Sequence, residues 1–203
     1  MTTMTPWTKL QGTSLWSKAE DAYSVPAGRH YHNMGHVRRL YEHAFAFGMP
    51  YCPHLDRAIL AHDVIIDGKP DEVERSAAWL SMRGDNSRTA RALILSTQTH
   101  RPCADNRLIL LDLSDFIYPD VSRRNTEALA MEAEAIKGEG CEAFVENSIR
   151  YLSCLSRVLS EGAPKISCSI ERNRFARIVK GMNQVVEDLR SDIGDVTISS
   201  PSP

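Results

Sequence analysis

The sequence predicts an all-α fold, in which one compact helical bundle forms a single domain. Hydrophobic residues recur with the three- and four-residue spacing of helices over most of the chain, and no segment is convincing as a strand. Glycine and proline interrupt this spacing repeatedly, which predicts short helices joined by turns. The 203 residues, 42% hydrophobic and 25% charged, are enough to bury one sizeable core.

Six helices are predicted in the first part of the chain, and turn residues mark their ends. The fourth begins at Pro70, which needs no amide partner in a first turn, while Asp71 and Glu72 suit the positive end of the helix dipole. Asp85 can cap the fifth helix, and Pro119 ends the sixth. The six predicted helices cover residues 15–23, 33–47, 55–66, 70–82, 87–100 and 105–118.

Three further helices are predicted beyond the sixth, over 120–137, 142–159 and 169–193. The first of them is rich in alanine and glutamate and is expected to be more exposed, whereas the last has one hydrophobic face. We expect a single domain over 1–198, with the chemical motifs in 29–118 and the C-terminal helices in 120–193. The serine- and proline-rich residues 199–203 are predicted to be a disordered tail.

Composition and charge exclude several classes of partner. The net charge of −2 argues against binding to long nucleic acids, which requires a strongly basic surface. No hydrophobic run reaches the roughly 18–20 residues of a membrane span, and residues 1–7 lack the layout of a signal peptide. The five cysteines are widely spaced, as expected for reduced thiols in a cytoplasmic protein. Assembly into a homo-oligomer is left open.

Two histidine clusters are the most informative feature of the sequence. Four of the seven histidines lie in the segment RHYHNMGH over 29–36 and in the dipeptide His62-Asp63. This dipeptide interrupts the hydrophobic run 58–66, where burial would cost about 2–7 kcal/mol for each unpaired polar group. A metal ion would satisfy both side chains, because borderline divalent ions accept imidazole nitrogen and carboxylate oxygen as ligands.

Helical spacing predicts how the two clusters meet. His32 and His36 are four residues apart and would share one helix face. A helix that carries His36, packed beside a helix that carries His62 and Asp63, would bring three ligands around one ion.

The fourth ligand is expected from an acid on another buried helix. Asp112 is the better candidate, because it interrupts the hydrophobic run 108–113, and Asp115 is the reserve. Alternatively, Asp112 could be a buried acid paired with Arg107. The histidines without a partner at a useful spacing are expected to be structural: His30, His43 and His54.

Three motifs in this order resemble the HD superfamily of metal-dependent phosphohydrolases: RHYHNMGH at 29–36, HDVIID at 62–67 and DEVERSA at 71–77. Within that superfamily they resemble the small subgroup of predicted metal-dependent HD phosphohydrolases, and a later DLS over 112–114 adds to the likeness. The resemblance is strong over 29–80 and fades after about residue 118.

The resemblance implies an HD-type helical bundle and the hydrolysis of a small phosphorylated molecule. The substrate would most often be a nucleotide, either a deoxynucleoside triphosphate, a nucleoside monophosphate or a cyclic nucleotide. The implied metal ligands are His36, His62, Asp63 and Asp112, and the ion would be Mn, Mg, Co, Ni, Zn or Fe. His32 matches a histidine of the distantly related cyclic-nucleotide phosphodiesterases that donates a proton to the leaving oxygen.

Several other polar residues near the clusters have both a catalytic and a structural interpretation. Asp67 would orient or deprotonate a water molecule, or shape the turn at Gly68. Glu74 would support the site from the next helix, or pair with Arg75 or Lys69. Three cations could hold a phosphate or be solvated surface charges, and His100 is a further candidate for the substrate pocket. The three cations are Arg29, Lys69 and Arg101.

A non-enzymatic function is the alternative: a helical binding or scaffold protein with a structural or vestigial metal site. A structural site would be closed by four protein ligands with no cleft beside it, whereas a catalytic site keeps an open position. The accessibility of the ligands therefore separates the two hypotheses.

Overall fold

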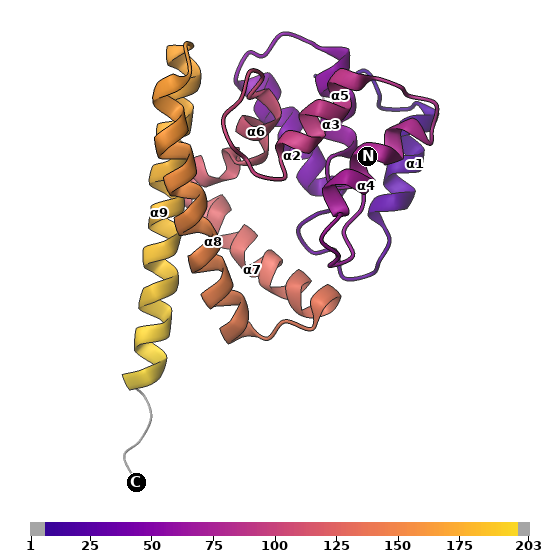
Figure 1. Cartoon of the computed structure of the whole chain (residues 1–203). Coiled ribbons are helices and arrows are strands. Elements are labelled where there is room, and N and C mark those ends of the chain that lie inside the picture. Colours follow the sequence, from indigo (N-terminus) through magenta and orange to yellow (C-terminus); the bar gives the residue numbers. More distant parts are fainter. Residues whose placement is uncertain (1–6, 199–203) are drawn as a thin grey trace.

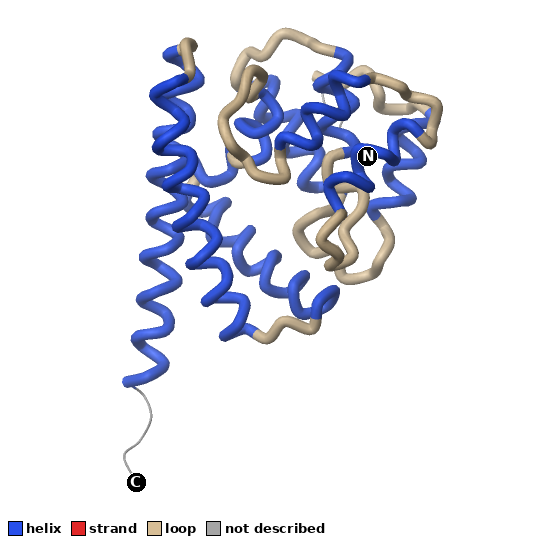
Figure 2. The backbone as a smooth tube through the Cα atoms, viewed as in Figure 1, coloured by secondary structure: helices blue, strands red, loops and turns tan. Residues whose placement is uncertain are grey.

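Helices make up all the regular secondary structure in residues 7–198, the part of the chain that the computed structural model describes, with side chains up to residue 192 (Figures 1 and 2). The predicted all-α fold is confirmed. The predicted disordered tail over 199–203 lies outside the described residues. Within the described part, the structure contains no helix with both the length and the apolar character needed to span a membrane.

Six short helices in the N-terminal part pack around a first hydrophobic core. Tyr41 is fully buried in this core, and the rings of Trp7 and Trp16 each stack against it with centroids 6.0 Å apart. The helices are α1 (Ser14–Tyr23), α2 (Met34–Ala46), α3 (Pro53–Ala61), α4 (Glu72–Ser81), α5 (Arg88–Ser96) and α6 (Arg107–Asp112).

Three longer helices form the C-terminal part. They are α7 (Pro119–Lys137), α8 (Cys141–Gly162) and α9 (Ser169–Ile198), with the short 3-10 helices η1 (Ser114–Ile117) and η2 (Ala163–Lys165) before and between them. Helices α8 and α9 run antiparallel along one side of the molecule, and α7, which contacts η1, α8 and α9, extends from them below the N-terminal helices (Figure 1). A second hydrophobic core lies mainly between α8 and α9.

Helix α6 connects the two cores. Leu108 and Leu111 belong to the first core, whereas Ile109 and Leu110 belong to the second. Because both sides of this helix are held by hydrophobic packing, Asp112 at its C-terminal end has a fixed position between the two halves of the molecule.

The third predicted helix ends earlier than expected, and this changes the setting of the second histidine cluster. The helix predicted over 55–66 ends at Ala61, so His62 and Asp63 follow it in a turn instead of lying inside it. The Arg29 guanidinium donates hydrogen bonds to the carbonyl oxygens of Asp63 (2.9 Å) and Val64 (3.1 Å). These bonds replace the helical partners of the two carbonyls and stabilise the irregular segment.

Two other predicted boundaries are also wrong. The helix predicted over 87–100 ends at Ser96, and His100 has a φ of 50°, which breaks the helical path. The helix predicted over 105–118 is divided into α6 and η1. Gly181 of α9 packs directly on η1, since a Cβ atom there would lie 1.7 Å from the Phe116 carbonyl oxygen.

Candidate metal centre

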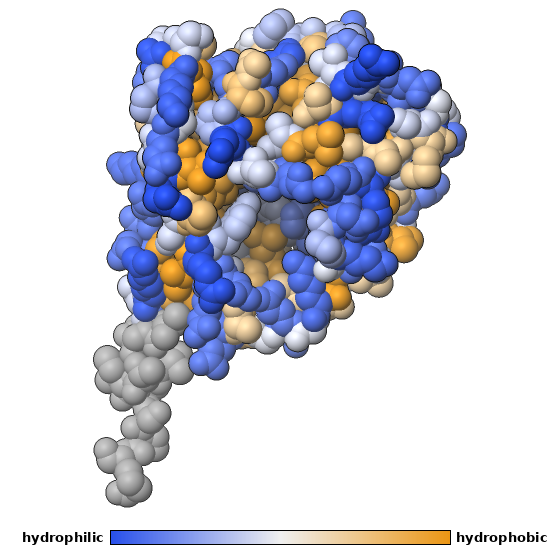
Figure 3. All heavy atoms as spheres, viewed as in Figure 1, coloured by the Kyte–Doolittle hydropathy of each residue, from blue (hydrophilic) through white to orange (hydrophobic). Residues whose placement is uncertain are grey.

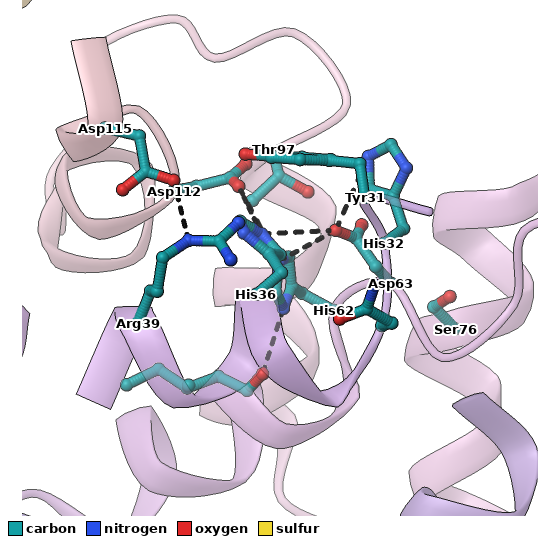
Figure 4. A network of polar contacts seen from close by, with 12 residues as sticks. Tyr31, His32, His36, Arg39, His62, Asp63, Ser76, Thr97, Asp112 and Asp115 are labelled. Carbon is teal, nitrogen blue, oxygen red and sulfur yellow. Dashed lines mark hydrogen bonds and ion pairs between the residues drawn. The ribbon is translucent and has the colours of Figure 1, made fainter. Parts of the chain in front are cut away.

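Four side chains from two helices and one turn converge on one point between the two halves of the molecule (Figure 4). His36 comes from α2, His62 and Asp63 follow α3, and Asp112 ends α6. One ligand atom from each of the four lies within 4.8 Å of all the others. The structure therefore brings together the predicted metal-ligand set.

Helix α2 places His36 in its first turn. The Asn33 side chain caps the helix by accepting a hydrogen bond from the Gly35 amide at 2.7 Å, which fixes where the helix begins. The imidazole of His36 is fully buried, and its Nε2 lies 3.2 Å from the Nε2 of His62 and 3.3 Å from Oδ1 of Asp112. Because the ring is enclosed by protein, an ion in the cluster can be reached only by its Nε2 atom.

The turn after α3 presents His62 and Asp63 together. His62 Nδ1 lies 2.9 Å from the Ile59 carbonyl oxygen and donates to it, which leaves the Nε2 lone pair for the cluster. The same Nε2 is 2.9 Å from Oδ2 of Asp63. The backbone bond thus fixes both the orientation and the tautomer that a metal-binding histidine requires.

The two carboxylates of the cluster have only imidazoles as partners. Burial lowers the pKa of His36, so this imidazole is neutral. Burial also opposes the charged form of His62, but Asp63 and Asp112 outweigh it and raise its pKa well above the usual value. In turn, His62 and His32 lower the pKa of Asp63 to about 2 against the effect of burial, and histidine contacts hold the pKa of Asp112 well below the usual range. Both carboxylates are therefore ionised, and protonated imidazoles balance them as long as no metal ion takes the place of the protons.

A divalent metal ion fits this arrangement. Two buried imidazole nitrogens and two carboxylate oxygens face the same point, and two neighbouring nitrogen lone pairs at 3.2 Å repel each other unless a cation or a proton lies between them. Nitrogen and oxygen ligands of this kind suit borderline divalent ions. The donor chemistry thus supports the expected metal cofactor and leaves the identity of the ion open.

His32 lies at the edge of the cluster and is held by a residue that the sequence analysis missed. Its Nε2 is 3.9 Å from Oδ2 of Asp63, and its Nδ1 is hydrogen-bonded to the Glu132 carboxylate of α7. The other Glu132 oxygen accepts from the amides of Tyr31 and His32, both at 2.9 Å. Burial disfavours the charged form of His32, but Asp63 and Glu132 outweigh it and raise its pKa.

Glu132 was not predicted as a site residue because the helix over 120–137 was expected to be more exposed. A signal was present, since Glu132 lies three residues after Leu129 and beside Ala133, on the face that packs inward. Its side chain is only 6% exposed. An acid on the hydrophobic face of an otherwise polar helix is the pattern that could have identified it.

His100 lies on the other side of the cluster. Its Nε2 is 2.8 Å from Oδ2 of Asp112, and the Tyr151 hydroxyl of α8 lies 3.4 Å from its Nδ1. His100 thus contacts the second oxygen of the carboxylate whose first oxygen faces His36. The sequence suggested His100 as a pocket residue but did not indicate Tyr151.

Asp115, the reserve ligand, belongs to a separate network. It accepts hydrogen bonds from Arg39 Nε at 3.1 Å, His43 Nε2 at 2.8 Å and Asn125 Nδ2 at 2.7 Å. Asp112 does not pair with Arg107, which is bound to Asp105 at 2.6 Å. Of the two acids left open by the sequence, Asp112 lies in the cluster.

Asp67 and Glu74 are not brought to the cluster. Asp67 was expected one turn after Asp63 on the same helix, but α3 has already ended, and the Arg75 guanidinium binds the Asp67 carboxylate at 2.6 and 2.9 Å. Glu74 is exposed and accepts a hydrogen bond from Gln98 at 2.6 Å. Among the described residues, none of the polar contacts of these two acids includes a member of the cluster.

The three cations expected to hold phosphate do not line the pocket beside the cluster. Arg29 is buried and binds backbone carbonyl oxygens, so it is neither a phosphate ligand nor a solvated surface charge. Lys69 is exposed and lies 3.4 Å from Asp67. Arg101 is exposed and lines a different pocket, next to η2. The interpretation as a solvated surface charge thus holds for Lys69 and Arg101 and is wrong for Arg29.

A pocket of about 420 Å³ opens beside the cluster. Asp112, His32 and His100 line one end of it, and α7 and α8 form much of its walls. Figure 3 shows a hollow where these helices face the N-terminal helices, with hydrophobic surface inside it. The side chains of Asp63 and Asp112 are 14% and 15% exposed, so the cluster can be reached from this side.

Comparison with known proteins gives no relative. No protein-family model, no curated protein sequence and no solved structure matches the chain. The HD resemblance therefore stays a prediction from the motifs.

Proposed function

We propose that the chain is a metal-dependent phosphohydrolase that acts on a small phosphorylated molecule. The observation that carries the proposal is the His/His/Asp/Asp cluster at the end of a pocket, with one carboxylate lining that pocket. The order of the HD-like motifs in the sequence supports the same reaction class. The four cluster residues would hold the ion, which is the role predicted for them.

The reaction needs a Lewis acid and a proton donor near the phosphoryl group. A divalent ion at the cluster would lower the pKa of water and stabilise charge on a phosphoryl oxygen. His32 would donate a proton to the leaving oxygen from Nε2, because Glu132 binds its Nδ1 and the raised pKa favours the charged ring. His100 would orient Asp112 through the 2.8 Å contact.

The alternative is a binding or scaffold protein with a structural metal site. Four protein ligands could close such a site. The exposure of Asp63 and Asp112 and the adjoining pocket favour the enzyme instead, since a closed structural site needs neither. A cytoplasmic location is part of the proposal; the five cysteines, all in the described part of the chain, are free thiols.

A hydrolysis screen on metal-stripped protein tests the proposal. The protein would be reloaded with Mn²⁺, Mg²⁺, Co²⁺, Ni²⁺, Zn²⁺ or Fe²⁺ and incubated with deoxynucleoside triphosphates, nucleoside monophosphates, cyclic nucleotides and simple phosphate monoesters. We expect product formation only after reloading, and its loss in Asp63→Asn. Asp115→Asn is the matched control, because it makes the same chemical change in an acid outside the cluster.

Two results would reject the enzyme. Full metal loading without hydrolysis of any ester would favour the structural alternative. Hydrolysis that is unaffected by Asp63→Asn would place the activity elsewhere.

A further inference from the structure

The pocket beside the cluster has two chemically different parts. Its inner end is polar and is formed by His32, His100 and Asp112. Beyond that end most of the exposed wall is hydrophobic, and it comes mainly from η1, α7 and α8, which also contribute the polar side chains of Thr126, Asn147, Ser148 and Tyr151. The hydrophobic lining includes Leu113, Phe116, Leu129, Ile136, Phe144 and Leu152.

The charges along the pocket oppose a polyanion. Lys137 is the only lysine or arginine among the described residues that line it, whereas Glu72, Glu132 and Glu139 add three carboxylates besides Asp112. One lysine, a protonated His32 and one divalent ion cannot balance these acids together with the several negative charges of a triphosphate. Arg29, Lys69 and Arg101 do not line the pocket, so they add nothing to this balance.

We propose that the substrate is a phosphate monoester of a hydrophobic alcohol or phenol, and that a nucleoside triphosphate is not. This inference rests on the proposed function. The single phosphate would lie at the polar end beside the metal cluster, and the organic group would lie against α7 and α8. A volume of about 420 Å³ lies in the usual range of small-molecule sites, which are mostly apolar with a few polar groups for orientation.

The hydrolysis of such an ester balances without another reactant. The bond between phosphorus and the ester oxygen breaks, and a bond from phosphorus to a water oxygen forms. His32 gives its proton to the leaving oxygen, one water proton stays on the phosphate, and the other restores the proton that His32 has given. The products are inorganic phosphate and a hydrophobic alcohol or phenol.

Phosphonates separate binding from hydrolysis, because their carbon–phosphorus bond withstands phosphate-ester hydrolysis. Calorimetric titration of the Mn²⁺-loaded full chain would compare methylphosphonate with hexylphosphonate. Burial of the alkyl chain strengthens binding by up to about fourfold per methylene, so we expect hexylphosphonate to bind at least about tenfold more tightly. In a parallel assay we expect naphthyl phosphate to be hydrolysed with a higher kcat/KM than a deoxynucleoside triphosphate.

A pair of variants on α7 locates the effect. Leu129→Asn places an amide in the hydrophobic wall and should remove most of the advantage of hexylphosphonate, with little change for methylphosphonate. Met131→Asn, on the same helix at a side chain 53% exposed and outside the pocket, should leave both affinities unchanged. Circular dichroism would confirm that both variants keep their helices.

The outcomes distinguish this inference from the proposed function. Equal binding of the two phosphonates, or preferential hydrolysis of a triphosphate, would overturn the hydrophobic substrate and leave the phosphohydrolase standing. Tighter binding of hexylphosphonate with no hydrolysis of any ester would reject the phosphohydrolase and support the hydrophobic phosphate ligand.

Discussion

Two histidine–carboxylate clusters lie along the same helix, and they differ in how their charge is balanced. His36 and His43 are seven residues apart on α2, and their acidic partners, Asp112 and Asp115, are three residues apart. Asp115 has Arg39 as a donor (Figure 4) and an amide donor in addition to its histidine. Asp112 has three histidine contacts and, among the described residues, no lysine or arginine contact.

The difference indicates which cluster can take up a metal ion. At Asp115 the carboxylate is neutralised by Arg39, which carries a permanent charge. At Asp112 a second carboxylate, Asp63, lies in the same cluster, and only imidazoles face the two acids. Because buried charges require a partner of opposite charge, the first network is complete, whereas the second depends on protons on its imidazoles or on a bound cation that replaces them.

The largest effect is expected from removing a metal ligand. His62→Ala should abolish both metal binding and hydrolysis while helical content stays near that of the parent, because the side chain faces the cluster at the end of α3. Elemental analysis measures the metal content, and far-ultraviolet circular dichroism measures the helical content. His43→Ala is the matched control and should keep its metal; full metal content in His62→Ala would show that the ligand assignment is wrong.

The next effect concerns the proton donor. His32→Ala should lower kcat by roughly 100-fold, the lower range for the loss of a general acid, with metal content unchanged. The reason is that His32 lies 3.9 Å from Asp63 at the edge of the cluster, where it is not needed to hold the ion. If His32→Ala lost its metal and His36→Ala kept it, the two roles would be reversed.

A stability effect is expected in the complete network. Burial opposes the ionisation of Asp115, but His43 and Arg39 outweigh it and lower its pKa to about 2. A lowered pKa stabilises the fold above the unfolded-state pKa, and this contribution is lost as the pH falls from about 4 to about 2. Asp115→Asn should therefore lower the free energy of unfolding by about 2 kcal/mol at neutral pH and remove this part of the pH dependence.

Chemical denaturation at several pH values measures this stability effect. Metal affinity should change by less than about threefold in Asp115→Asn, since no cluster atom contacts this residue. A loss of metal in this variant without a loss of stability would contradict the separation of the two networks.

The smallest effect is expected for the fourth ligand. Asp112→Asn keeps the size of the side chain and one oxygen donor, so metal affinity should fall by at least about tenfold, roughly 1.4 kcal/mol, without being abolished. Competition with a metal-sensitive dye measures the change. An unchanged metal affinity would mean that Asp112 is not a metal ligand and only binds His100.

The ligands could be predicted because their sequence signal is local. A histidine and an aspartate inside the hydrophobic run 58–66, and an aspartate inside 108–113, are unusual wherever the chain folds. Helical spacing is local too, which explains why each predicted helical segment overlaps a helix of the described chain, even where 55–66, 87–100 and 105–118 were predicted to continue too far.

Contacts between distant segments could not be predicted in the same way. Glu132 reaches His32 from a helix 100 residues later, and Asp115 reaches His43 over 72 residues. The end of α3 at Ala61 depends on Arg29, which satisfies the carbonyls that follow. Asp67 was predicted to lie one helical turn after Asp63. This prediction was wrong because α3 ends before both residues.

Anomalous diffraction from crystals grown with Mn²⁺ or Zn²⁺ would locate the metal ion directly. We expect one strong anomalous peak bounded by Nε2 of His36, Nε2 of His62 and carboxylate oxygens of Asp63 and Asp112. If the protein binds metal in solution but its crystals show no peak at these four atoms, or show the peak at Asp115, the assignment of the metal centre is wrong.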